Sequence, residues 1–117
     1  MSAEAPVRRA LRPRRTSGDQ LREALLLLCG HRGQIVEHRE RPWASITFAG
    51  ARHTVALLFI GEDAVLAGEE FLAALPDHEF AIAGQLVADA SATAVEHRML
   101  PTPRLAVTCE LLLLEDA

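Results

Sequence analysis

The sequence has no lysine and no tyrosine, and it has only two cysteines. The basic residues apart from histidine are therefore all arginines, 12 in number. Together with the many alanines, this bias is what a GC-rich genome produces, so it does not by itself indicate arginine chemistry. Cys29 closes a helical pattern and Cys109 lies on the apolar side of a strand pattern. Both cysteines are expected to be small buried hydrophobic residues, which argues against a disulfide-bonded scaffold.

Motifs of catalysis and of phosphate binding are also missing. Ser45 and Ser91 lack the Gly-x-Ser-x-Gly surroundings of a nucleophile elbow, and the glycines do not cluster into a phosphate-binding loop. No apolar run is long enough to cross a membrane, and no signal peptide is recognisable. We therefore expect a soluble cytoplasmic protein that carries no cofactor.

Charge is distributed unevenly along the chain. Residues 1–15 hold five arginines and one glutamate, a net charge of +4, whereas the rest holds seven arginines and fifteen acidic residues, a net charge of −8. A body this acidic repels phosphate backbones, so only the basic segment is a candidate for binding nucleic acid. Since residues 1–16 have no hydrophobic periodicity, we expect a disordered basic arm ahead of one domain over residues 17–117. The candidate binding residues of the arm are Arg8, Arg9, Arg12, Arg14 and Arg15.

Two segments have the apolar spacing of amphipathic helices. In the first, Ser17 and Gln20 have the spacing of a capping box, and the pattern runs to about Cys29. In the second, acidic residues from Glu62 onward suit the first turn of a helix, and Pro76 ends it. Both patterns carry a wide apolar stripe, so both helices are expected to pack on a sheet.

Five segments alternate between apolar and polar residues, as half-buried strands do. They are Gln34–Arg39, Trp43–Ala49, His53–Ile60, Phe80–Met99 and Arg104–Glu115, with a hairpin expected around Gly50-Ala51. The segment His53–Ile60 is apolar on both faces, which predicts a central strand. The sequence thus predicts a single α+β domain in the order α-β-β-β-α-β-β. Its mostly antiparallel sheet has about five strands, with two helices on one face.

Histidines are the only candidates for a metal or proton-transfer site. His38, His53 and His97 each lie near the end of a predicted strand, so they would converge if those strand ends meet. Mixtures of histidine and carboxylate ligands do bind zinc and iron. No spacing in the sequence matches a common zinc motif, so scattered surface histidines are the alternative.

The apolar surplus indicates binding more than catalysis. A sheet with two helices leaves one face open, yet the run Leu111–Leu114 offers apolar groups to both faces. We therefore expect a non-enzymatic interaction module that self-associates as a homodimer and binds a protein or a small apolar ligand. A histidine-based metal protein or enzyme, and a nucleic-acid contact through the arm, are the two alternatives.

Overall fold

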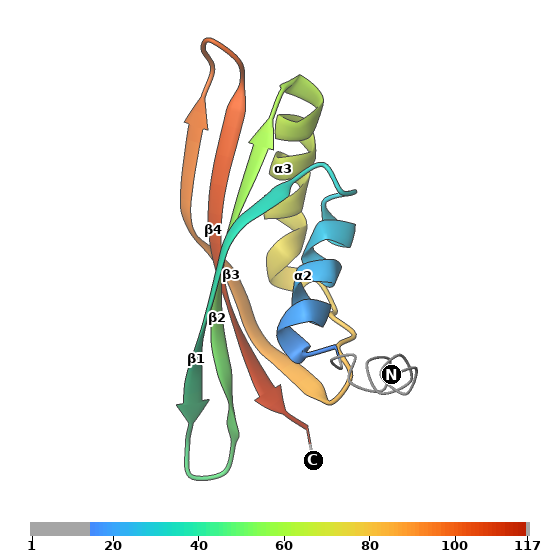
Figure 1. The fold of residues 1–117 in the computed structure, drawn as a ribbon, viewed down its shortest axis with the longest axis vertical. Helices are drawn as coiled ribbons and strands as arrows, with labels where there is room; N and C mark the ends of the chain where they lie inside the picture. The colour runs from blue at the N-terminus through green and yellow to red at the C-terminus, as the bar shows by residue number, and fades with distance from the viewer. Residues whose placement is uncertain (1–14, 117) are drawn as a thin grey trace, which may run out of the picture.

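The structure is a computed structural model that describes residues 15–116, with elements numbered as in Figure 1. The element order is α-β-β-α-β-β, in part as predicted, with one strand fewer before the second helix. The elements are α2 (Ser17–Leu28), β1 (Gln34–Ala44), β2 (Ala49–Ile60), α3 (Glu62–Ala74), a short 3-10 turn η1 (Leu75–Asp77), β3 (Gln85–Arg98) and β4 (Arg104–Glu115).

The strands form one antiparallel sheet in the order β1-β2-β4-β3, and both helices lie on the same face of it (Figure 1). The strand β2, which contains the predicted segment His53–Ile60, is internal, as its two-sided apolar pattern predicted. The core lies between this face and the helices. Its central members include Leu21 and Leu25 from α2, Phe71 from α3, and Leu57 and Phe59 from β2. The result is a single α+β domain of two layers.

The sheet has four strands in the described residues, where the sequence predicted about five. The difference arises over Glu40–Pro42, the charged stretch that separates the predicted strands Gln34–Arg39 and Trp43–Ala49. In the structure β1 continues through Pro42, paired with Ala51 of β2. Proline is tolerated there because β1 is an edge strand, and an edge strand needs hydrogen-bond donors on one side only.

The first hairpin turns at Ser45–Phe48, not at the predicted Gly50-Ala51. The Ser45 backbone N–H donates to the Phe48 carbonyl (2.7 Å), and the Phe48 N–H donates to the Ser45 hydroxyl (3.1 Å). Gly50 instead lies inside β2. A Cβ at this position would stand 2.0 Å from the backbone oxygen of Leu113, so the residue is needed for a close approach of β4.

The helix caps and the last hairpin also differ in detail from the prediction. The N-cap of α2 is Thr16 with Asp19 completing the capping box, one residue before the predicted Ser17. The strand β3 begins at Gln85 and is interrupted twice by register shifts, at Ala88 and at Thr93. Each shift moves the following side chains to the opposite face, so the uniform alternation expected over Phe80–Met99 does not describe one continuous face.

Candidate functional site

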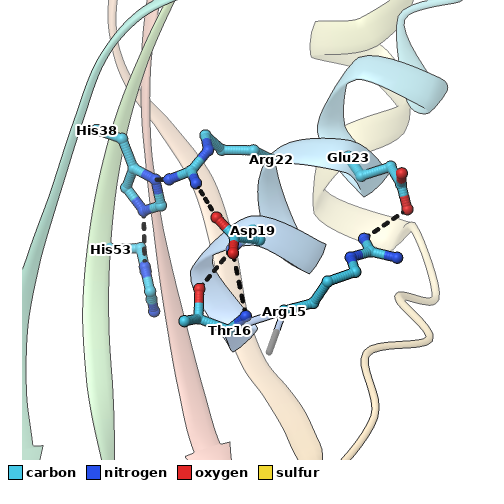
Figure 2. Close-up of polar contacts among 7 residues, drawn as sticks. All are labelled: Arg15, Thr16, Asp19, Arg22, Glu23, His38 and His53. Atoms are coloured by element: carbon cyan, nitrogen blue, oxygen red, sulfur yellow. Dashed lines mark hydrogen bonds and ion pairs between the residues drawn. The ribbon is translucent and has the colours of Figure 1, made fainter. Parts of the chain in front are cut away.

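A line of polar side chains crosses from the first turn of α2 to the sheet (Figure 2). Its outer end is the capping box: Asp19 N–H donates to the Thr16 hydroxyl (3.0 Å), and the Asp19 carboxylate accepts from the Thr16 backbone (3.1 Å). The backbone hydrogen bond from Thr16 is the main reason why the pKa of Asp19 is lowered, with further contributions from the Thr16 side chain and the charge of Arg22. The carboxylate is therefore held ionised at the N-terminus of the helix.

Arg22 follows one turn later and connects the helix to the sheet. Its guanidinium forms an ion pair with Asp19 and a 2.7 Å hydrogen bond to Nδ1 of His38 on β1. His38 Nε2 lies 2.8 Å from Nδ1 of His53 on β2, as Figure 2 shows. The two histidines are diagonal neighbours on the covered face, since His38 is opposite Val55 in the ladder.

The direction of these hydrogen bonds follows from Arg22. A guanidinium only donates, so Nδ1 of His38 must accept and its proton must be on Nε2. This N–H then donates to Nδ1 of His53, which places the proton of His53 on Nε2. His53 is 0% exposed, and its Nε2 has no hydrogen-bond partner among the described residues. The line thus runs from a charged surface pair to a neutral imidazole in the core.

Both histidines are held in the neutral form. Desolvation by burial is the main reason why the pKa of His38 and the pKa of His53 are lowered, and the charge of Arg22 acts in the same direction. The carboxylate of Glu40 opposes both shifts. Protonating His38 at Nδ1 would place this N–H against the donating guanidinium of Arg22, and protonating His53 at Nδ1 would place it against the donating Nε2–H of His38. We conclude that the line joins α2 to β1 and β2 while its histidines are uncharged.

The predicted metal ligands are only partly brought together. His38 and His53 are in contact, but His97 is opposite Leu105 on β4, six positions from the residue opposite His53. At about 3.3 Å per residue this separation is roughly 20 Å. Within residues 15–116, no group of three or more His, Cys, Asp or Glu side chains is arranged to hold a metal ion.

Four of the five arm arginines, Arg8, Arg9, Arg12 and Arg14, lie outside the described residues, as does most of the arm expected over residues 1–16. Arg15 is described, and its guanidinium pairs with Glu23 of α2 at 2.7 Å (Figure 2). Arg15 precedes the N-cap Thr16, and this exposed pair connects it to the helix.

Four of the ten large apolar side chains that are exposed among the described residues lie at the turns of the two hairpins. Ile46 is fully exposed and Phe48 is 50% exposed at the β1–β2 turn. Met99 and Leu100, 63% and 79% exposed, occupy the β3–β4 turn. The two turns lie at opposite ends of the sheet, and the β1–β2 turn extends beyond the helices (Figure 1). We call these four residues the tip residues.

The sheet face away from the helices is mainly polar at its centre. It holds a groove of about 510 Å³ whose lining includes Arg39, Arg41 and Arg52. Arg52 pairs with Glu110 at 3.6 Å across the β2–β4 ladder. Leu112 and Leu114, which the strand alternation places on this face, are only 9% and 7% exposed, whereas Ile60 and Leu86 on the same face are each 54% exposed.

By its fold, this protein is a two-layer α+β protein in which two helices pack on one face of an antiparallel sheet. Neither a protein-family model nor a curated protein sequence matches the chain. A solved structure titled "Virion of native gene transfer agent (GTA) particle" contains a chain with a similar fold, at a TM-score of 0.55 and 14% sequence identity. The similarity covers 84% of this chain and 91% of that chain. No helix in residues 15–116 is long and apolar enough to span a membrane.

Proposed function

We propose that this protein is a structural interaction module, a subunit that contacts other protein subunits through the tip residues of its two hairpins. The observation that carries the proposal is the exposure of Ile46, Phe48, Met99 and Leu100 at opposite ends of one sheet. Exposed apolar groups gathered at defined places mark interaction sites more than apolar residues scattered singly do.

The position of the tips favours a particular kind of contact. Gly50 is paired with Leu114 near one tip and Ile60 with Arg104 near the other, so about ten residues of β2 separate them. Two different surfaces at opposite ends allow one subunit to contact two neighbours, as in head-to-tail assemblies. The structure of similar fold comes from a particle titled a virion, which supports a role in a multi-subunit assembly.

The homodimer expected from the sequence is the simplest form of this proposal. In it, one tip of each copy packs against the same tip of its partner, which is the self-complementary geometry of a two-fold dimer. An assembly that uses both tips of each copy would grow beyond two subunits.

Native mass spectrometry and light scattering on the full-length protein test the proposal. The variant pairs Ile46→Ser with Phe48→Ser, and Met99→Ser with Leu100→Ser, remove one tip each. The control is Val36→Ser, which removes a 58% exposed apolar residue on the edge strand β1, away from both turns. We expect self-association of the wild type to weaken at least tenfold in one or both tip variants and not in the control, since buried apolar side chains near an interface centre dominate affinity.

Two results would contradict the proposal. A wild type that stays monomeric over a wide concentration range would overturn the homodimer and every other homo-oligomer. An assembly equally stable in both tip variants would show that its contacts lie elsewhere on the surface. A mass in excess of whole subunits would instead favour a bound metal or small molecule.

A further inference from the structure

A second exposed apolar region lies between the two helices. A groove of about 670 Å³ runs between the C-terminal end of α2 and the N-terminal half of α3. Leu27 from α2 and Leu66 from α3 line it and are 68% and 58% exposed. Both project from the helix sides that do not contact the sheet. This groove is distinct from the hairpin tips and uses none of their residues.

The charge around the groove is predominantly acidic. Asp63 and Glu70 line it, and Glu62 and Glu69 lie on the same helix. All four are exposed, and none of the ion pairs formed between described residues includes them. Arg32 is the one basic residue of the lining. The chemistry that fits such a surface is a segment with apolar side chains interleaved with positive charges.

We propose that the groove binds residues 5–11 of the same chain. This segment contains Val7 and Leu11, with Arg8 and Arg9 between them. It therefore offers apolar groups to Leu27 and Leu66 and positive charge to Asp63 and Glu70. The strongly basic segment and the acidic body are then two parts of one contact, which gives a reason for the uneven charge of the sequence.

The distances allow the segment to reach its own groove. A helix of 12 residues such as α2 is about 18 Å long, at 1.5 Å per residue. Ten residues of chain span at most about 36 Å. Counted back from Arg15 at the start of α2, Leu11 is at most about 14 Å away along the chain and Val7 at most about 29 Å. The part of the segment up to Leu11 can therefore return along the helix to its C-terminal end. Attachment to the same chain gives a high effective concentration, which favours the groove of its own chain over that of another copy.

Photo-cross-linking of the full-length protein tests this contact. A benzoylphenylalanine replaces Leu66 in the groove and, as the matched control, Val36 on β1, which is equally exposed. An equimolar mixture of ¹⁴N- and ¹⁵N-labelled chains shows by mass whether a cross-link joins one chain or two. We expect cross-links from position 66 to residues 5–11 within one chain, and none to that segment from position 36.

Charge and apolar variants then separate the two parts of the contact. Asp63→Lys with Glu70→Lys should lower the cross-link yield about tenfold, and so should Val7→Ser with Leu11→Ser. Glu37→Lys, on the other face of the sheet, should leave the yield unchanged. High salt should weaken the contact because exposed charges are screened.

Several outcomes would overturn the inference. Equal yields from positions 66 and 36 would show that the segment does not select the groove. Insensitivity to the Val7 and Leu11 changes would show attraction by charge alone. Cross-links only between differently labelled chains would assign the groove to another copy. None of these results depends on the tip residues, so the inference and the proposed function can fail separately.

Discussion

The covered face of the sheet and the hairpin tips are made by the same strands, yet apolar side chains are buried on the covered face and exposed at the tips. On the covered face, Val55, Leu57 and Phe59 of β2 are buried, and the two histidines His38 and His53 are joined to Arg22 of α2 in one line of hydrogen bonds. At the turns, Ile46 and Leu100 are left in solvent. The strands continue past the region where the helices could bury them, as Figure 1 shows for β1 and β2.

This difference in burial implies that the covered face stabilises the fold, whereas the tips are available for contacts with other surfaces. Burial of the covered face holds the fold together, because each buried aliphatic or aromatic side chain contributes about 1.5–3 kcal/mol. The tips contribute little to folding, since their apolar area stays in water in the single chain. Their burial becomes available only when another surface covers them. The following predictions test this division, beginning with the largest effect.

Leu57→Asp should unfold the domain. Leu57 is 1% exposed in the core, and an unpaired carboxylate there costs several kcal/mol, a large part of the stability of a small domain. The control is Ile60→Asp on the same strand, where the side chain is 54% exposed and the cost should be below about 1 kcal/mol. Circular dichroism and thermal melting measure both. A folded Leu57→Asp protein would show that β2 is not central.

Gly50→Ala should destabilise the domain by roughly 1–3 kcal/mol, the usual range for overpacking. The added methyl group meets the backbone oxygen of Leu113, which cannot rotate away. The matched control is Ala49→Val, a larger addition at the exposed neighbouring position. Urea denaturation gives both free energies of unfolding. Equal stability of the two variants would contradict the close approach of β2 and β4.

The polar line should make stability fall in mild acid. Because the pKa values of His38 and His53 are lowered in the folded protein, the unfolded chain binds protons more readily below the ordinary histidine pKa of about 6.5. The stabilisation is complete above that pH and is lost as the pH falls below it. Urea denaturation between pH 7.5 and 5 should show this loss in the wild type.

A variant of His53 and a control variant test whether this pH dependence comes from the polar line. His53→Leu should reduce the slope of stability against pH below 6.5, since it removes the core end of the line. Val36→Ala, which shortens an exposed non-ionisable side chain on β1, should leave the slope unchanged. An identical slope in the wild type and in His53→Leu would show that other groups cause the acid sensitivity.

The smallest effect on stability is expected at the tips. Ile46→Ser with Phe48→Ser should change the free energy of unfolding of the dissociated chain by no more than about 0.5 kcal/mol, as exposed substitutions do. Melting at low protein concentration measures this. A large loss of stability would show that these side chains support the fold of the single chain and would remove the contrast between face and tips.

The sequence predicted the features that depend on periodicity. Both helices and the central place of β2 follow from the spacing of apolar residues, which burial in the core requires. Pro42 was misleading because its tolerance depends on β1 being an edge strand, a tertiary property. The shifts at Ala88 and Thr93 left no mark in the alternating pattern, because alanine and threonine suit either face.

Less of the candidate site than of the fold could be predicted from the sequence. The approach of His38 to His53 was one of the predicted convergences, since both residues lie on neighbouring strands. The contribution of Arg22 and Asp19 was missed, because it depends on how α2 crosses the sheet. The spacing of these two residues, three apart in the first turns of a helix, was a visible signal of an ion pair. Nothing in the sequence indicated that this pair would face a histidine.

Both outer strands of the sheet are irregular, and this has a consequence for how copies of the chain can aggregate. The edge β1 carries a register shift at Val36 and lacks an N–H at Pro42, and the edge β3 has shifts at Ala88 and Thr93. A new strand extending the ladder on either side would meet a mismatch within a few residues. Unlimited strand-by-strand growth of the amyloid type is therefore disfavoured on both sides, even though the sheet of residues 15–116 has two outer strands, each paired on one side only.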